Sequence, residues 1–496
     1  MSVRRNLLVR AVIDVLESRR LFCVSHELTP APGPLPAHKL PDGAIDHKLD
    51  WYQPAEVVSL GAESSPLDAA PTFSVNAAGL PLLTSRSDGT GFKVFLDFDG
   101  FGANLPFSTD GDTANYSPAE QNSIYYTWRD MVSYFSALNV NVTTVQPPTG
   151  GSNPSFAWHL TSNSISGGYA YVGWLDNSAP HGFNQGSNAV SRRSGIAHEI
   201  GHLLGLYHQG EYDLYGNLTS EYSDGWDSRS RTVIGIDYNT NIRQWFYGRS
   251  SSNAGSLQND LQLMANTVSA RVGGDGFRPD DFGGTIATAA SVPANGMVEA
   301  FIERYSDADV FQINSSGGRW NFDATPIFES SVEPKLELLD ASGIVIASKD
   351  DADQRSNVNN NDVEFSLDLT AGIYYVKVSS SGDISELGEY LMTASPLMGG
   401  FKTQDVSTVF RTGSVSYDPV SGVITQIGGG ADIANASDQF RFTYNILDGN
   451  GSITVRVDSV DNVDPLAKAG VMIRQSLSNN SASMLLNVQP SGALNN

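Results

Sequence analysis

The segment HEIGHLLGLYH, from His198 to His208, constrains this chain more than any other part of its sequence. Residues four positions apart lie on the same face of a helix, so His198 and His202 are expected to project together. Gly205 tolerates a positive φ, which predicts that the helix ends there and the chain turns sharply. Such a turn brings His208 back toward the first two histidines.

Three imidazoles that meet at one point are a ligand set for zinc, and they leave a fourth coordination position open for water. Glu199 follows the first of these histidines, and its carboxylate can accept a proton from metal-bound water. The pattern therefore predicts zinc-dependent peptide hydrolysis, with His198, His202 and His208 as ligands and Glu199 as the general base. Two alternatives remain open, which are hydrogen-bonded histidines without a metal and a metal-bound domain without turnover.

The part of the chain around this motif reads as one α/β (α+β) domain over residues 91–275. The run KVFLDFDGF, from Lys93 to Phe101, is rich in β-formers and predicts a strand. Ser117-Pro118-Ala119-Glu120 predicts a helix start, with Ser117 as the N-cap and Glu120 completing a capping box. Further strands are expected at NVNVTTV and GGYAYVGW, followed by the helix with the histidines.

The character of the sequence changes after Arg278-Pro279, where short β-runs separated by turn residues replace the helical period. This pattern predicts a β-sandwich over residues 280–397. Residues 399–496 are also expected to be all-β, and their end after the strand-like SMLLNV suggests that this last domain is incomplete in the chain. The predicted fold class is thus a multidomain protein, with the α/β domain followed by all-β sandwich modules.

The first 90 residues show no long period of 3.6 or 2. Residues 25–90 are rich in Pro, Ala, Ser and Gly, which predicts a disordered linker or pro-segment. Residues 1–24 form a poor secretory signal, because charged residues interrupt their apolar stretch. The run VLESRRLF in this segment resembles the LEPR-x-L-L segment of many exported bacterial proteins, and an ordinary amphipathic helix is the alternative.

Composition narrows the classes of partner. The 54 acidic and 30 basic residues give a net charge of −24, which argues against nucleic acid, because phosphate binding needs clustered Lys and Arg. The charge suits a soluble protein outside the cell, although solubility alone also explains it. No apolar run approaches the roughly 18 residues of a transmembrane segment, and the single cysteine, Cys23, cannot form an intramolecular disulfide.

The extended motif HEIGHLLGLYH resembles that of the metzincin family of zinc endopeptidases, and the similarity to exported bacterial members spans about residues 90–275. The resemblance implies a secreted or cell-surface bacterial zinc metalloendopeptidase that acts on proteins or peptides. It matches His198, His202 and His208 to the zinc ligands and Glu199 to the general base. It also places GGYAYVG where the edge strand of the family binds an extended peptide by main-chain pairing.

Metzincins carry a methionine turn beneath the zinc, and the segment that fits is TVIGIDYN, Thr232 to Asn239. Ile234 occupies the place of the methionine, and it can supply the apolar floor because the methionine is not a ligand. Tyr238 could reach the site as an extra ligand or oxyanion donor, with a packing tyrosine as the alternative. Met264 is expected in the core of a final helix instead.

The later modules have resemblances of their own. Residues 280–397 resemble the bacterial pre-peptidase C-terminal domain, in SDADVFQI and LTAGIYYVKV. Such domains accompany secreted proteases and can bind matrix or surface polymers. Residues 399–496 look like about half of a concanavalin-type jelly roll, which could bind polysaccharide. The rival interpretation is a non-catalytic surface adhesin that keeps the protease domain as a scaffold, and the intact Glu199 argues against it.

Calcium is a further expectation, because it needs several oxygen ligands. Four aspartates in two short acidic turns could supply them: Asp97, Asp99, Asp110 and Asp112. The loop KDDADQRSNVNNND, residues 349–362, could bind calcium as well. Acidic turns without an ion are the alternative in both places.

Overall fold

A computed structural model describes the greater part of the chain. The described residues are 44–46, 73–186, 193–223, 230–235, 242–252, 255, 257–294, 296–327, 330–350, 363–382, 386–397, 401–407, 409, 411–418, 422–430, 432–433, 438–445, 453–461, 466–490 and 494–495. The expected export segment at 1–24, Tyr238 and nearly all of the acidic loop at 349–362 lie outside them. No helix among the described residues is long and apolar enough to cross a membrane.

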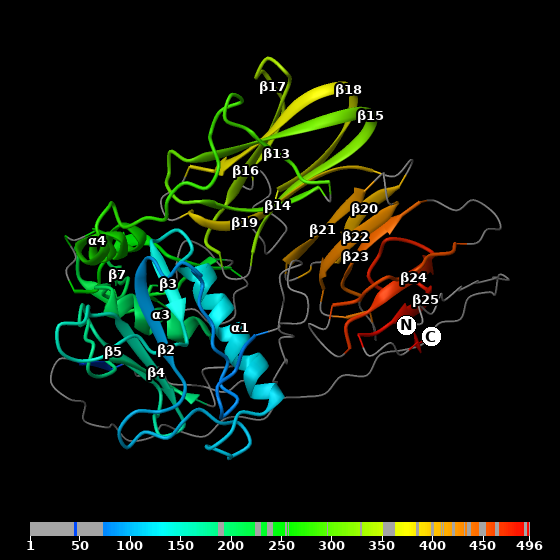
Figure 1. Ribbon diagram of the computed structural model, residues 1–496. Helices are drawn as coiled ribbons and strands as arrows, with labels where there is room; N and C mark the ends of the chain where they lie inside the picture. The colour runs from blue at the N-terminus through cyan, green and yellow to red at the C-terminus, as the bar shows by residue number, and fades with distance from the viewer. Residues whose placement is uncertain are drawn as a thin grey trace.

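A mixed six-stranded sheet forms the centre of the first domain (Figure 1). Its strands, in spatial order, are β1 (Ala44–Asp46), β5 (Gly168–Tyr171), β6 (Gly182–Gln185), β4 (Ala157–Ser162), β2 (Phe92–Asp97) and β3 (Val140–Thr143). β2 runs parallel to β3 and β4, and β5 runs antiparallel to β6. The parallel strands are buried almost throughout, as expected for strands covered on both faces.

Three helices pack with this sheet, and they are α1 (Pro118–Tyr134), α3 (Arg193–Leu203) and α4 (Asp260–Val272). The predicted start of α1 is confirmed, because Ser117 Oγ accepts from the backbone N–H of Glu120 and the Glu120 carboxylate accepts from the N–H of Ser117. α3 contacts β4, β5 and β6, which places the histidine motif beside β5. Met264 on α4 is fully buried, as the sequence predicts.

Short strand pairs fill the chain between α3 and α4. They are β7 (Glu211–Tyr212) with β8 (Leu218–Ser220), β9 (Ser230–Thr232) with β10 (Ile242–Gln244), and β11 (Tyr247–Arg249) with β12 (Leu257–Asn259). The β9–β10 pair is parallel and the other two are antiparallel. The β9–β10 pair lies directly before and after the segment that matches the methionine turn.

Parts of the expected linker belong to this domain. Leu80 and Leu83 are buried, because the segment from position 73 packs against the first sheet. Thr144 anchors it by donating from Oγ1 to the carbonyl of Pro81 and accepting from the N–H of Leu83. β1 also comes from the expected linker and pairs antiparallel with β5. β5 is therefore covered by β1 in this structure, and the peptide-binding role expected for GGYAYVG stays a prediction.

The second domain, which is called the β-sandwich below, is built on one curved seven-stranded sheet (Figure 1). Its strands are β13 (Ala290–Ser291), β14 (Met297–Ile302), β15 (Ala308–Pro326), β16 (Pro334–Leu339), β17 (Val345–Asp350), β18 (Val363–Ser380) and β19 (Gly388–Pro396). Two of the short β-runs expected between turns, VEFSLDL and AGIYYVKV, lie in the single strand β18. β18 continues through Gly372 without a turn, because β15 pairs with it along nearly its whole length.

The last part of the chain is all-β in the residues that the structure describes, in agreement with the predicted fold class. Its strands are β20 (Lys402–Val406), β21 (Arg411–Asp418), β22 (Val423–Gly429), β23 (Phe440–Tyr444), β24 (Ala469–Arg474), β25 (Ser483–Val488) and β26 (Leu494–Asn495). β20 pairs with β23, β21 with β22, and β24 with β25 and β26. Figure 1 shows these strands beside the curved sheet.

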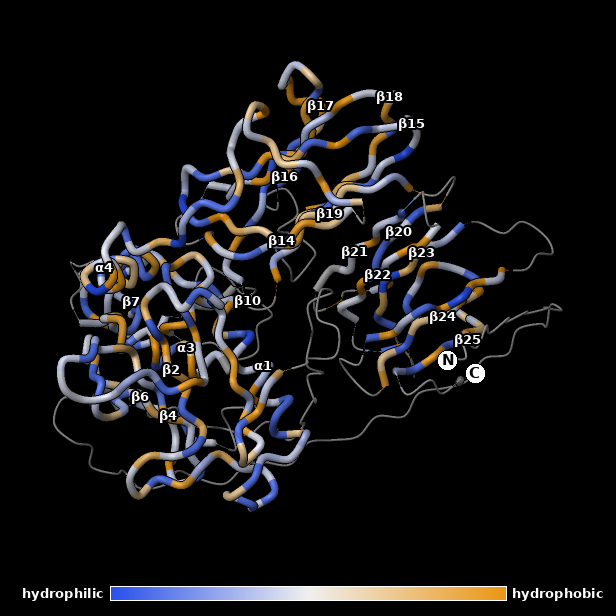
Figure 2. The backbone as a smooth tube through the Cα atoms, viewed as in Figure 1, coloured by the Kyte–Doolittle hydropathy of each residue, from blue (hydrophilic) through white to orange (hydrophobic). Residues whose placement is uncertain are grey.

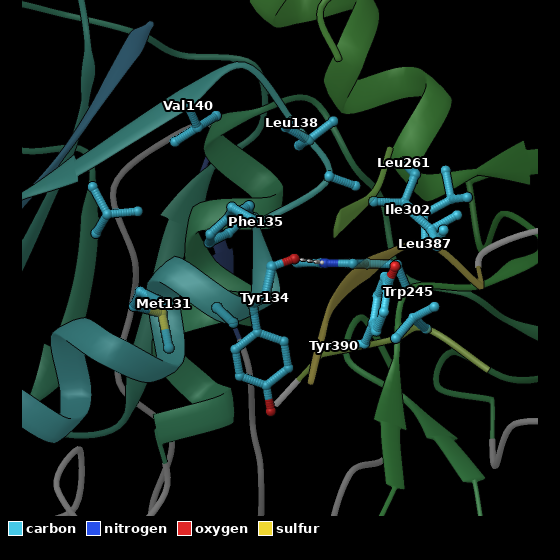
Figure 3. Packing of buried hydrophobic residues seen from close by; sticks show 14 of the residues in the cluster. Met131, Tyr134, Phe135, Leu138, Val140, Trp245, Leu261, Ile302, Leu387 and Tyr390 are labelled. Atoms are coloured by element: carbon cyan, nitrogen blue, oxygen red, sulfur yellow. Dashed lines mark hydrogen bonds between the residues drawn. The ribbon is translucent and has the colours of Figure 1, made fainter. Parts of the chain in front are cut away.

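The first two domains share a continuous apolar core. Figure 2 shows apolar segments along β2 and α3 in the first domain and along β14 and β19 in the second. Figure 3 shows Trp245 between α1 residues and the β-sandwich residues Ile302, Leu387 and Tyr390. The Arg129 guanidinium on α1 crosses the same interface and donates to both carboxylate oxygens of Glu389 on β19, at 2.8 and 2.6 Å. A buried bidentate ion pair of this kind fixes orientation as well as adding energy.

Candidate metal centre

The three histidines of the motif come together as the sequence predicts. One imidazole nitrogen from each of His198, His202 and His208 lies within 4.8 Å of the others, and all three side chains are buried. The Nε2 atoms of His202 and His208 are 3.2 Å apart. Two nitrogens bound to one tetrahedral zinc at about 2.05 Å are about 3.3 Å apart. The spacing of this pair therefore fits two ligands of the same zinc ion.

The hydrogen-bond partners of the three Nδ1 atoms show that the Nε2 atoms are the ones available to a metal. The Nδ1 atoms of His198 and His202 lie 2.7 Å from the carbonyl oxygens of Val233 and Leu206. A carbonyl only accepts, so each Nδ1 carries the proton and each Nε2 presents a lone pair. The Nδ1 of His208 lies 2.9 Å from the Glu221 carboxylate, which imposes the same tautomer. Three lone pairs aimed at one point repel each other, and a cation among them removes that repulsion.

The turn after α3, the helix that carries the histidine motif and is called the zinc helix below, has the geometry that was expected from Gly205. Its φ is 104°, a conformation that side-chain-bearing residues rarely adopt. The N–H of Leu206 donates to the carbonyl of Gly201 at 3.0 Å, and the N–H of Gly205 donates to the carbonyl of His202 at 2.9 Å. These bonds end the helix in a Schellman-like turn. The turn carries His208 back to the face of the first two histidines.

Glu199 lies beside the histidine cluster and is buried, with 2 % of its surface exposed. Burial raises the pKa of its carboxyl to about 8. β5 approaches it closely, because a Cβ added at Gly168 would lie 2.6 Å from Glu199 Oε1. The absence of a side chain at Gly168 thus leaves room for Glu199 directly beside the backbone of β5.

Ile234 follows Val233, whose carbonyl oxygen lies 2.7 Å from the Nδ1 of His198, and its role as the floor of the metal site stays a prediction. It is fully buried and lies against the zinc helix at Gly201, where an added Cβ would be 3.3 Å from Ile234 Cδ1. The Trp245 ring reaches the same point, at 3.2 Å from that Cβ position. Ile234 also accepts a hydrogen bond on its carbonyl from the N–H of Gln209 at 3.2 Å. Ile234 therefore packs in apolar surroundings against α3, and its backbone is hydrogen-bonded to Gln209, the residue after His208.

The structure adds residues that the sequence pattern did not identify. Glu221 accepts from His208, and the Tyr222 ring lies over the same imidazole with centroids 4.3 Å apart. Gln258 makes two hydrogen bonds to the backbone of Tyr207, at 3.0 and 2.6 Å, next to His208. Glu221 and Tyr222 follow β8 and Gln258 lies in β12, and no spacing in the sequence links them to the motif.

The four aspartates expected to bind calcium do not gather into a metal-binding group among the described residues. Asp97 accepts from the indole N–H of Trp158 at 2.8 Å and from backbone N–H groups at its own turn. Asp110 and Asp112 accept from neighbouring backbone and side-chain groups of their own loop. They are turn-forming residues, and the calcium expectation for them is not supported.

Comparisons with known proteins agree with this centre. Residues 113–209, from just before α1 to the residue after His208, match the family model described as Metallo-peptidase family M12B Reprolysin-like. Metallopeptidase AprA of Pseudomonas marginalis is 28 % identical over 209 residues, which cover 38 % of this chain and 39 % of that protein. The chain thus spans about two fifths of the length of this curated relative.

A comparison with solved structures matches about a quarter of the chain. The pre-peptidase C-terminal domain of collagenase from Bacillus anthracis matches at 17 % identity, with 24 % of this chain and 98 % of that chain covered and a TM-score of 0.18. A likeness at this level says nothing about what the β-domains bind. The family match over residues 113–209 and the histidine cluster agree with the metallopeptidase resemblance of the sequence motif.

Proposed function

We propose that this chain is a secreted zinc metalloendopeptidase in which His198, His202 and His208 hold the metal and Glu199 acts as the general base. The observation that carries the proposal is the convergence of three imidazoles whose Nδ1 atoms are all engaged, beside a buried carboxylate. The family match supports the class of reaction. The donor set is all nitrogen, which suits zinc and does not suit calcium or magnesium.

The roles of the residues follow from their positions. Zinc, when bound, supplies a Lewis acid and lowers the pKa of its water. Glu199 takes the proton of the attacking water on its carboxylate while the water oxygen bonds to the scissile carbonyl carbon. When the peptide C–N bond breaks, Glu199 returns that proton to the departing amine nitrogen.

Substrate binding is proposed along β5. An extended peptide would pair with the backbone of this strand and pass Glu199, which lies against Gly168. β1 pairs with β5 at this edge, so residues 44–46 must leave β5 before a peptide can take their place. The N-terminal segment would then act as a cover of the substrate edge.

Secretion and surface attachment belong to the same proposal. The export-like run VLESRRLF and the net charge of −24 support a place outside the cell. The β-modules would hold the enzyme on a protein matrix or a polysaccharide, which the sequence resemblances of residues 280–397 and 399–496 support. The assignment of five segments, 1–24, 25–90, 91–275, 280–397 and 399–496, is kept as the proposed domain division, with residues 73–90 added to the third.

The test uses the full chain with zinc and a denatured protein as substrate. We expect cleavage that a chelator abolishes and that added zinc restores. A chain that holds one zinc ion and still shows no chelator-sensitive cleavage would contradict the enzyme assignment. That result would favour the alternative, a non-catalytic adhesin with a protease scaffold, and binding of the same chain to matrix proteins or polysaccharides would then be the activity to measure.

A further inference from the structure

Val233 connects the histidine cluster to β10, a strand that also contacts the second domain. Val233 holds the Nδ1 of His198 through its carbonyl, and its N–H donates to the carbonyl of Gln244 at 2.9 Å. Gln244 is the last residue of β10, which runs parallel to β9 just before Val233. The backbone of Gln244 is therefore the immediate support of the residue that orients His198.

The side chain of Gln244 reaches in the other direction, into the β-sandwich. Its Nε2 donates to the carbonyl oxygen of Ser331 and to Oε1 of Glu333, both at 3.0 Å. The next residue, Trp245, donates from its N–H to Ser331 Oγ at 3.4 Å. All of these side chains are buried, with at most 8 % of their surface exposed. β10 is thus hydrogen-bonded through the Gln244 backbone to Val233, beside the histidines, and through the Gln244 side chain to the second domain.

Trp245 fixes this strand from a third side. Its indole N–H donates to the carbonyl of Tyr134 at 2.6 Å, shown as a dashed line in Figure 3. Its ring packs against Phe135 with centroids 5.4 Å apart and also reaches the zinc helix at Gly201. Since the surroundings are close-packed, a shift of β10 cannot be absorbed locally and is passed to Val233 and to the helix.

We propose that Gln244 and Glu333 are positioning residues of the metal centre, so that the β-sandwich is a structural part of the active site. This inference rests on the proposed function and deepens it. The path runs from Glu333 through Gln244 and Val233 to His198, and every step is a hydrogen bond between buried groups. Partners that orient metal-bound histidines typically change metal affinity or activity by about 10- to 100-fold when they are removed.

The chain offers matched variants for the test. Gln244→Met keeps the side-chain length and removes both hydrogen bonds to the β-sandwich. Glu333→Gln keeps an acceptor oxygen for Gln244, whereas Glu333→Met does not. Ser133→Ala is the interface control, because Ser133 Oγ makes a buried hydrogen bond of 2.7 Å to the carbonyl of Ile327 across the same interface without reaching Val233.

Each full-length variant is loaded with Zn²⁺, and the rate of zinc loss to a chelator is measured beside kcat, KM and Tm. We expect Gln244→Met to lose zinc about tenfold faster and to show a kcat about tenfold lower, with KM within about twofold. Glu333→Met should change in the same direction by about threefold, and Glu333→Gln and Ser133→Ala should stay within about twofold of the wild type.

The outcomes separate the two hypotheses. If Gln244→Met and Glu333→Met lower Tm as Ser133→Ala does but release zinc at the wild-type rate, the contacts are only structural and the positioning role is wrong. If Gln244→Met does not fold, the milder Glu333→Met against Glu333→Gln decides the question. Wild-type protein that holds zinc but cleaves nothing would contradict the proposed function, while the zinc-release comparison would still decide the positioning role.

Discussion

His202 and His208 place their Nε2 atoms 3.2 Å apart, although the two residues are separated by a helix end and a turn. Two lone-pair-bearing nitrogens this close are stable together only when a cation or a proton lies between them. The turn at Gly205 creates the approach, and the partners of the two Nδ1 atoms hold each ring in place. The metal centre is therefore built by the backbone as much as by its ligands.

Glu221 is expected to tune the third ligand. Its carboxylate accepts from the Nδ1 of His208 at 2.9 Å, which fixes the ring and makes Nε2 a better donor to a metal. Glu221→Ala should weaken zinc binding by about tenfold, measured by competition with a chelator of known affinity. Glu221→Gln retains an acceptor oxygen and should lose less than threefold. Equal zinc affinities in the wild type and both variants would show that the hydrogen bond from His208 to the half-exposed Glu221 does not support the ligand.

Ile234 can be exchanged for the methionine of related enzymes. The two side chains are similar in volume, and Ile234 lies in a fully buried apolar site against Gly201. Ile234→Met should therefore cost less than about 1.5 kcal/mol in the free energy of unfolding and change kcat by less than about threefold. Ile234→Ala leaves a cavity beneath the zinc helix and should cost about 2–4 kcal/mol. A large gain of activity in Ile234→Met would mean that the isoleucine impairs the site.

The N-terminal segment should limit access to the substrate edge. β1 pairs with β5 over Ala44–Asp46, the edge at which we expect a peptide to bind. Deletion of residues 1–72 should lower KM for an extended peptide several-fold, and deletion of residues 1–43, which keeps β1, should not. Steady-state kinetics of the two truncated proteins provide the comparison. Identical KM values in both would place the substrate elsewhere than along β5.

The β-sandwich should lose stability as the pH rises. Burial raises the pKa of the Glu303 carboxyl to about 10 and that of Asp309 to about 9, and neighbouring acids add to both shifts. Because the folded-state values exceed the unfolded ones, both groups favour folding fully below about pH 4 and lose that contribution progressively as pH rises toward 9–10.

The variant that tests this pH dependence is Glu303→Gln. It should match the wild type near pH 4 and be more stable by roughly 2–4 kcal/mol at pH 8, in protein freed of divalent cations. Urea unfolding at both pH values measures the difference. Asp280→Asn, at an exposed acid of the same cluster, serves as the control and should shift stability by less than about 0.5 kcal/mol. A Glu303→Gln protein with the pH slope of the wild type would show that Glu303 does not titrate in this way.

The sequence predicts the local geometry of the centre, because that geometry depends on spacing along one helix and on one glycine. His198, His202 and Gly205 need only helical periodicity and a turn to be placed. The capping box at Ser117 is equally local and is present. Ile234 was located through the resemblance of its segment, since no periodic pattern marks it.

The parts that the sequence does not predict depend on contacts between distant segments. Glu221 reaches the site from the segment after β8, Gln258 reaches it from β12, and Glu333 contacts Gln244 from another domain. The position of β1 on β5 was missed because three residues in a Pro- and Ala-rich stretch give no strand signal of their own. The aspartates from Asp97 to Asp112 were misleading because turn-capping carboxylates resemble ion ligands in a sequence.

The most direct test of the central claim compares zinc-loaded wild-type protein with zinc-loaded Glu199→Gln, with zinc content and peptide cleavage measured on the same samples. We predict about one zinc ion per chain in both proteins and a kcat at least about 100-fold lower in the variant, because Glu199 transfers the proton but does not bind the metal. Equal cleavage by the two proteins, with equal zinc content, would contradict the account.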